Sequence, residues 1–331
     1  QGLAGDAGAR GLLSRLSVAS EQDRAALGIA FSGAMSRARS EDLPAKAVAL
    51  LDTLGVPGRE VLIEALGRMP TASAARELDR LTGRLASPDD RRKLAEAAAG
   101  HATMLPTIRR MTNDLDPSVQ ANAVWSLGVT GEAADIGSLE KLVQHRDVAV
   151  AANAVASIGR ISVRHRGAGV GALCAGLDDG RTYVRANALA ALAVSGQRCD
   201  KGEKERGLLF ADSAPVVRAT AASLLRRVPS PDGGADSRAL RRCAYDDRNG
   251  SVAAACKERP AARVSRGSEA EPVVVFVVPS GRSAPEPRAP FALVLADGLM
   301  RIGIADRRGA VFERAAPRGE VTLAVPATLV P

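Results

Sequence analysis

The chain has 331 residues, of which 46% are hydrophobic and only 2% aromatic, so we expect room for two domains and a core of Ala, Leu and Val. The net charge is +8, but the basic residues are almost all Arg and are dispersed, as a GC-rich genome would also produce. No run of about 18 uncharged apolar residues occurs, so the sequence predicts no membrane-spanning helix. If the protein is exported, we expect its leader to have been removed before Gln1.

The first third of the chain predicts helical hairpins. Residues 7–37 read as two helices, the second capped by Ser20, although this pair matches the later repeats poorly, as terminal repeats of a solenoid commonly do. From residue 43 the helices become regular, and prolines stand at or near their starts, where a missing N–H costs little. The pair Asp89-Asp90 begins one of these helices, where negative charge favours the helix dipole.

The segment 116–128, DPSVQANAVWSLG, recurs in related form at 147–159, 180–193 and 211–225. Small and apolar side chains fall at i, i+4 and i+8 in these copies, so one stripe of each helix faces a core. In the first two copies an Asp stands where an N-cap belongs, and a Gly stands near the end. A period of about 30 to 35 residues is typical of stacked repeats, none of which can bury its apolar face alone.

This repeat resembles the HEAT repeat, particularly its phycobilisome-lyase-like bacterial form, whose second helix reads roughly D-x-x-V-R-x-A-A-x-x-A-L-G. Val184-Arg185 and Val217-Arg218 match the Val-Arg pair of that pattern, whereas Gln120 and Ala151 depart from it. The resemblance implies a mainly α protein, a HEAT/armadillo-like α-solenoid of about seven or eight helical hairpins. We assign residues 1–260 to it.

Asn122, Asn153 and Asn187 occupy one repeat position, with Thr220 in the fourth copy. An Asn inside a helix is mildly unfavourable and must satisfy its amide, so its recurrence needs a reason. One interpretation is a structural ladder in which each amide bonds the backbone of the neighbouring repeat, and the flanking Ala residues favour it. The other is similar to armadillo proteins, in which a row of Asn on the inner helices holds the backbone of an extended peptide.

Two further features are candidates for contact sites. Trp125, the only tryptophan, either packs in the core or anchors a partner at the inner groove. The densest basic region lies at the end of the solenoid and either forms a solvated helix face or binds nucleic acid, acidic lipid or an acidic protein. Its candidate residues are Arg241, Arg242, Arg248, Arg263 and Arg266.

Four cysteines form two local pairs in the sequence, Cys174 with Cys199 and Cys243 with Cys256. Each spacing lets an antiparallel hairpin bring two sulfurs together, although four buried thiols remain the alternative. Disulfides would indicate an oxidising compartment, the bacterial periplasm or cell exterior, and reduced thiols the cytoplasm. No Cys-x2-Cys occurs, which argues against zinc.

The composition changes after residue 260. Residues 261–270 read as a linker, and residues 271–331 predict a small all-β, sandwich-like domain of five short strands. The run PVVVFVVP at 272–279 is typical of a strand buried on both faces or of one that joins a sandwich. Asp297-Gly298, between two apolar runs, predicts a two-residue type I′ hairpin.

No catalytic, cofactor or metal motif occurs in the sequence. His101, His145 and His165 lack a recurring acidic neighbour, so the His-Glu pairs of HEAT-type di-iron hydroxylases are absent. We therefore predict a non-enzymatic protein-protein interaction scaffold without a cofactor, a subunit of a bacterial cell-envelope assembly that leaves peripheral membrane association open. The alternatives are nucleic-acid binding through a basic solenoid face, which the dispersed charge disfavours, and a bilin lyase-like enzyme, which the repeat resemblance alone suggests.

Overall fold

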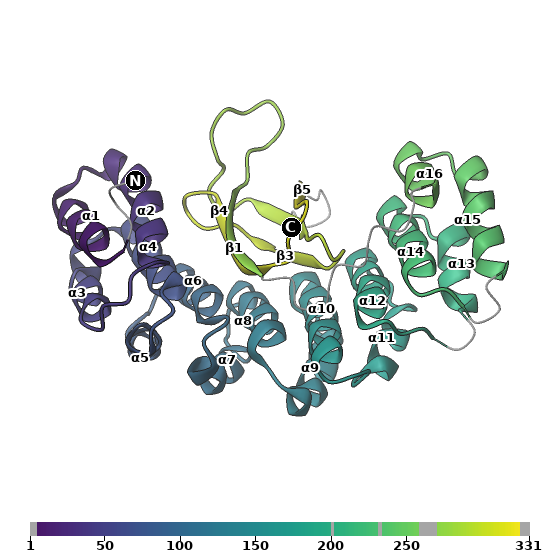
Figure 1. Ribbon diagram of the computed structural model, residues 1–331, viewed down its shortest axis with the longest axis horizontal. Helices are drawn as coiled ribbons and strands as arrows, with labels where there is room; N and C mark the ends of the chain where they lie inside the picture. Colours follow the sequence, from purple (N-terminus) through teal and green to yellow (C-terminus); the bar gives the residue numbers. More distant parts are fainter. Residues whose placement is uncertain (1–4, 200–201, 231–233, 258–269, 325–331) are drawn as a thin grey trace.

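The computed structural model describes residues 5–199, 202–230, 234–257 and 270–324. Its sixteen α-helices alternate between the outer and inner rows of a curved solenoid, and a small β domain lies on the concave side (Figure 1). The inner row is continuous, because each even-numbered helix packs on the next even-numbered helix from α2 to α16.

The outer row consists of α1 (Asp6–Val18), α3 (Leu43–Ala49), α5 (Ala72–Leu81), α7 (Leu105–Met111), α9 (Ile136–Val143), α11 (Val170–Gly176), α13 (Glu203–Ala211) and α15 (Gly234–Asp246). The inner row consists of α2 (Glu21–Met35), α4 (Val56–Arg68), α6 (Pro88–Ala98), α8 (Pro117–Thr130), α10 (Val148–Arg164), α12 (Thr182–Ser195), α14 (Pro215–Arg227) and α16 (Gly250–Lys257). Short 3-10 turns are η1 (Leu51–Thr53), η2 (Ala102–Met104) and η3 (Ala133–Asp135).

The inner helices begin at the caps that the sequence predicts. The Asp116 carboxylate accepts from the backbone N–H groups of Ser118 and Val119, and Asp147 accepts from that of Val150. Ser20 caps α2 through the backbone N–H of Asp23. These bonds satisfy N–H groups that have no partner within the first turn of a helix.

The repeated glycines do not end their helices, because α8 continues past Gly128 and α10 past Gly159. A Cβ at Gly128 would lie 2.5 Å from the Ser157 Oγ, and one at Gly159 would lie 2.5 Å from the Ala191 Cβ. Both distances are too short for two non-bonded heavy atoms. The glycines therefore allow successive inner helices to approach one another closely.

The C-terminal region forms two small antiparallel sheets. One pairs β1 with β4, and the other has the order β3-β2-β5. The strands are β1 (Glu271–Phe276), β2 (Pro290–Val294), β3 (Met300–Ile304), β4 (Ala310–Ala316) and β5 (Thr322–Ala324). Of the predicted linker, residues 261–269 lie outside the described residues, as do residues 325–331 at the end of the predicted β domain.

Two local predictions for this domain differ from the structure. The β2–β3 loop has three residues between Leu295 and Leu299, with a positive φ of 93° at Gly298 but not at Asp297, so it is not a type I′ turn. Of the two interpretations of residues 272–279, a strand buried on both faces is wrong for β1, whose residues are exposed or half-buried. It lies at the edge of a two-stranded sheet, where apolar sequence does not guarantee burial.

Two disulfides link outer to inner elements near the C-terminal end of the solenoid. Cys174 of α11 is bonded to Cys199 beyond α12, and Cys243 of α15 is bonded to Cys256 of α16. The structure thus pairs the four cysteines locally and leaves none free. Within the described residues, no helix is long and apolar enough to cross a membrane.

Candidate functional site: the concave face and its bound strand

The concave face of the inner row holds strand β3, which packs on α10, α8 and α12. Asn153 of α10 donates its side-chain N–H to the Ile302 carbonyl over 2.9 Å and accepts from the Ile302 N–H over 2.9 Å. Asn187 of α12 makes the same two bonds with Met300, each 2.8 Å long. Each amide therefore binds both backbone polar groups of one residue in the strand.

Met300 and Ile302 can be bound in this way because β3 is an edge strand of its sheet. The backbone bonds Leu295 N–H to Leu299 O and Ala305 N–H to Ala289 O show that odd-numbered residues of the strand bond to β2. The even-numbered residues therefore direct their N–H and C=O groups away from β2. The two asparagines occupy the place that a neighbouring strand would take.

The same amides also join successive inner helices. Asn153 donates to the Ala121 carbonyl over 3.0 Å, and Asn187 donates to the Ala152 carbonyl over 2.8 Å. The two interpretations of the asparagine row thus describe bonds that coexist, because one N–H of each side chain bonds the preceding helix and the other bonds β3. The held peptide belongs to the same chain.

The row changes character toward the N-terminus. Asn122 donates to the Arg92 carbonyl over 3.2 Å, but its oxygen accepts from the Arg301 guanidinium instead of from a backbone N–H. Lys93 occupies the place in α6 that Asn122 occupies in α8. The Arg92 carbonyl, one residue before Lys93, accepts from Asn122, just as the Ala121 carbonyl, one residue before Asn122, accepts from Asn153. At the other end of the row, the Thr220 hydroxyl donates to the Val216 carbonyl of its own helix.

Arg301 is the buried centre of this N-terminal half, with 1% of its surface exposed. Its guanidinium lies 2.7 Å from a Glu96 carboxylate oxygen and 3.3 Å from one of Glu313, and it donates to the Phe312 carbonyl over 2.7 Å. Glu96 also accepts from the Phe312 N–H over 3.1 Å. Arg301 therefore joins α6 to two strands of the β domain.

Lys93 lies fully buried beside Arg301, among three carboxylates. Its Nζ is 2.5 Å from Glu96, 3.1 Å from Asp306 and 3.5 Å from Glu64. Arg308 bridges Glu64 at 2.5 Å and Asp306 at 2.7 Å. Solenoid and β domain each supply both signs of charge, so ion pairs form within each surface and also across the interface between them.

These contacts shift the pKa values of the buried groups. Burial alone would lower the pKa of Lys93, but the carboxylates of Glu96, Asp306 and Glu64 together raise it. Burial alone would raise the pKa of Asp306, but Lys93 and Arg308 hold it well below its usual range. Burial, together with the charge of Asp306, raises the pKa of Glu60 to about 8. Glu60 is the member of the cluster that we expect to hold a proton near neutral pH.

Asp89 forms ion pairs with arginines in addition to its favourable position at a helix start. Its carboxylate lies 2.7 Å from Arg307 and 3.0 Å from Arg288, both in the β domain, and 3.1 Å from Arg92. The adjacent Asp90 pairs with Arg59 at 2.9 Å. The helix dipole alone therefore does not account for this acidic pair.

Trp125 of α8 contacts strand β4 through Glu313, and 2% of its surface is exposed. Its indole N–H donates to Glu313 over 2.7 Å, and the Arg160 guanidinium lies 4.1 Å from the ring centroid. The ring is therefore both buried and part of the interface between the solenoid and the β domain.

The predicted basic region lies away from this interface. Arg241 and Arg242 are exposed on α15, and Arg248 is exposed just after it. Arg263 and Arg266 lie outside the described residues. The structure thus gathers three of the five predicted arginines at the C-terminal end of the outer row.

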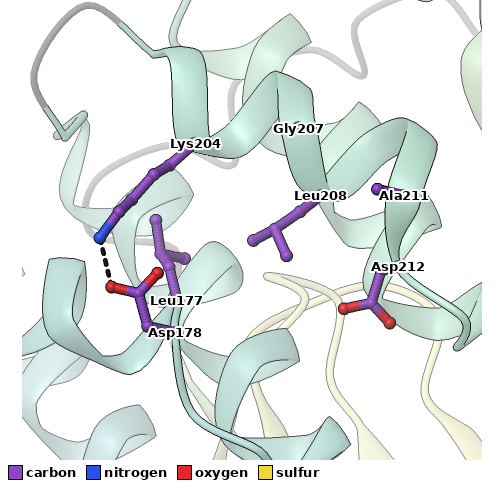
Figure 2. A pocket seen from close by; sticks show the side chains of 7 residues that line it. All are labelled: Leu177, Asp178, Lys204, Gly207, Leu208, Ala211 and Asp212. Atoms are coloured by element: carbon purple, nitrogen blue, oxygen red, sulfur yellow. Dashed lines mark hydrogen bonds and ion pairs between the residues drawn. The ribbon is translucent and has the colours of Figure 1, made fainter.

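A pocket of about 360 Å³ opens between the end of α11 and helix α13 on the outer row (Figure 2). Leu177 and Leu208 form its apolar part, and Lys204 is paired with Asp178 across one side. The Asp212 carboxylate at the other side is already bonded to Arg185. Among the described residues, no group of three or more His, Cys, Asp or Glu side chains is arranged to hold a metal ion.

Comparison with known proteins gives a fold but not a family. No protein-family model matches the chain, and no curated protein does. Among solved structures, YibA from Escherichia coli is 14% identical, with a TM-score of 0.52 over 74% of this chain and 90% of that one. Together with the two rows of helices, this likeness defines a HEAT-repeat-like helical fold.

Two other solved structures are also similar. Human deoxyhypusine hydroxylase in complex with glycerol is 18% identical, covers 75% of this chain and 93% of its own, and has a TM-score of 0.34. An engineered protein is 15% identical, with the same coverage of 75% and 93% and a TM-score of 0.30.

The predicted non-enzymatic interaction scaffold is corrected by these findings. No scaffold function is shown, because a helical repeat fold by itself does not determine a function. The prediction also assumed that the inner surface is open to a partner. In the structure, β3 of the same chain lies on that surface.

Sequence reasoning did not find Lys93, Glu96, Arg301 and Glu313 as members of the site. One signal was present in the sequence. Helices α8 and α10 have asparagine at the position of Lys93 and a small or apolar residue at the position of Glu96. Charged residues inside an apolar repeat indicate a buried ionic partner. Nothing in the sequence indicated that the partner would be Arg301, about 200 residues away.

Proposed function

We propose that the concave face of the solenoid is a binding site for an extended polypeptide strand, and that its ligand is strand β3 of the same chain. The observation that carries this proposal is the pair of two-way bonds from Asn153 and Asn187 to the backbones of Ile302 and Met300. In this role the solenoid fixes the β domain in one orientation and covers an edge strand that would otherwise pair with other chains.

Recognition has two parts in this proposal. The asparagines bind backbone atoms, which every residue carries, so they contribute affinity for an extended conformation without selecting a sequence. Arg301 stands between Met300 and Ile302 in the strand, and its guanidinium lies in an acidic site formed by the Glu96 carboxylate and the Asn122 side-chain oxygen. A strand with a central arginine is therefore the ligand that this site fits best, because another side chain would leave Glu96 with Lys93 but without its second cationic partner.

The proposal is tested in the full-length chain with the double variant Asn153→Ala and Asn187→Ala, with Thr220→Ala as the matched control. Hydrogen exchange followed by mass spectrometry should show faster exchange in the peptide that contains Met300 and Ile302 in the double variant. The inner helices should keep their protection, and the control should match the wild type. Unchanged protection of β3 in the double variant would refute the proposed recognition.

We further propose that the protein works outside the reducing cytoplasm, in the periplasm or outside a bacterial cell. The two disulfides support this location. Intact mass of the purified native protein after alkylation, with and without reductant, tests it. We expect alkylation of all four cysteines only after reduction, and free thiols in the untreated protein would contradict the location.

The finer classification that we propose is a HEAT solenoid of eight hairpins of the phycobilisome-lyase-like bacterial form. The alternation of outer and inner helices and the Val-Arg pairs at 184–185 and 217–218 support it. An experimental structure of the full chain tests the number of hairpins, and seven or nine pairs of outer and inner helices would contradict it.

A further inference from the structure

The outer helix α15 carries a surface that the β domain does not use. Arg238, Arg241 and Arg242 are exposed on this helix, and their spacing of three or four residues places them on one face. Tyr245, with 86% of its surface exposed, continues the same face. We call this face, together with Arg248 in the following turn and Phe210 of neighbouring α13, the α15 surface.

The α15 surface has an excess of positive charge. Asp246, the exposed acid within it, is bonded to Arg242 at 3.1 Å, and the nearby Asp247 is bonded to Arg218 of α14 at 2.7 Å. Four arginines therefore face one acid. Within the described residues, Arg238, Arg241 and Arg248 form no ion pair, which leaves these three guanidinium groups available to an anionic partner.

Aromatic side chains lie among these arginines. Phe210 is 43% exposed, and the Arg242 guanidinium lies 5.1 Å from its ring centroid. A guanidinium over a ring face is a favourable cation–π contact, and aromatic rings beside basic side chains are typical of surfaces that lie at a membrane–water interface. The disulfide between Cys243 and Cys256 ties α15 to α16, so this surface is presented by a fixed helix.

We propose that the α15 surface docks on an anionic lipid bilayer. A bilayer offers a negatively charged headgroup layer for the arginines and a less polar layer just below it for Tyr245 and Phe210. Nucleic acid would match the charge alone, but it fits poorly with a disulfide within the same helical pair, because disulfides persist where nucleic acid is scarce. The proposal places the outer row, and not the concave face, against the membrane (Figure 1).

The test is flotation of the full-length protein with vesicles of phosphatidylcholine, with and without about one-third phosphatidylglycerol. We expect binding to the anionic vesicles only, weakened by salt. The double variant Arg241→Ser and Arg242→Ser should bind roughly ten- to thirtyfold more weakly. Tyr245→Ala should weaken binding severalfold at unchanged charge.

The matched control is Arg146→Ser with Arg282→Ser, which removes two exposed arginines elsewhere and changes the net charge equally. The control should bind as the wild type does. Equal loss of binding in both double variants would show a net-charge effect and overturn the proposal, as would wild-type protein that does not bind anionic vesicles. Binding of an oligonucleotide through Arg241 and Arg242, without binding of vesicles, would assign the surface to nucleic acid and also overturn it.

Discussion

The two halves of the interface between solenoid and β domain use different chemistry on the same repeated helices. On α10 and α12, neutral amides bind the backbone of β3 at Ile302 and Met300. On α4 and α6, charged side chains bind charged side chains, with Lys93 and Arg301 at the centre. A single architecture thus supports a backbone contact that tolerates sequence change and an ionic contact that depends on each partner.

The difference has an energetic consequence. A neutral hydrogen bond contributes about 1 kcal/mol net, whereas a buried charge that loses its partner costs about 3–5 kcal/mol. The ionic half therefore determines which strand is accepted. The amide half determines that the ligand is a strand at all.

The largest expected effect comes from breaking the ionic half at Arg301. Arg301→Ala leaves Glu96 and Glu313 buried without this guanidinium, so we expect the free energy of unfolding to fall by about 3–5 kcal/mol. Urea unfolding measures the change. The exposed Arg282→Ala should stay within about 0.5 kcal/mol of the wild type, and an equally small effect of Arg301→Ala would contradict the ionic network.

A smaller effect tests whether both halves depend on the same helix packing. A Cβ at Gly67 of α4 would lie 2.7 Å from the Ala97 Cα, and one at Gly159 of α10 would lie 2.9 Å from the Ala191 Cα. Gly67→Ala and Gly159→Ala should each destabilise by about 1–3 kcal/mol through overpacking. Gly137→Ala at an exposed position of α9, with nothing within 4 Å, should instead stabilise slightly. Stabilisation by all three changes would show that the inner helices are less closely packed than described.

The smallest expected effect is a pH dependence of the free energy of unfolding, which should come from the ionic half of the interface and not from the amide half. The pKa of Glu60 is about 8 in the folded protein, whereas an unperturbed glutamate has a pKa of 4.5, so between these values the folded state holds a proton that the unfolded state has lost. Stability contributed by this group is therefore fully present below pH 4.5 and lost as the pH rises through 8. Glu60→Gln cannot lose a proton, so we expect the variant to gain at least about 1 kcal/mol over the wild type between pH 5 and 9.

Glu140→Gln, an exposed change on α9, is the control for this titration. Urea unfolding at several pH values should give parallel curves for the control and the wild type. A wild-type curve that stays parallel to that of Glu60→Gln would show that Glu60 titrates normally and that the ionic half has no such pH dependence.

Much of the solenoid could be predicted from the sequence, for reasons that are local. Asp116 and Asp147 mark helix starts because a carboxylate satisfies the free N–H groups of the first turn within three residues. Cysteine spacing predicted the pairing because a short hairpin limits which sulfurs can meet. The role of Gly159 could not be found in this way, since a helix-ending Gly and a contact Gly look the same in one sequence.

The site itself depends on contacts that no short segment contains. The asparagine row allowed a backbone ligand only as the less favoured of two interpretations, and a backbone has no sequence signature, so nothing identified β3 as that ligand. In the sequence MRIGI, Arg301 looks like an ordinary solvent-exposed arginine of a strand. Only the folded structure shows that it contacts Glu96, which is 205 residues away in the sequence. Open and filled grooves therefore have the same sequence pattern, which is why the scaffold prediction was wrong.

Amide exchange at single residues, measured by NMR on the unmodified protein, tests the central claim most directly. Met300 and Ile302 direct their N–H groups away from β2, as Val274 and Phe276 of edge strand β1 direct theirs away from β4. We expect slow exchange at the first two, where Asn187 and Asn153 accept the bonds, and fast exchange at the other two. Equally fast exchange at all four amides would contradict a strand held on the concave face.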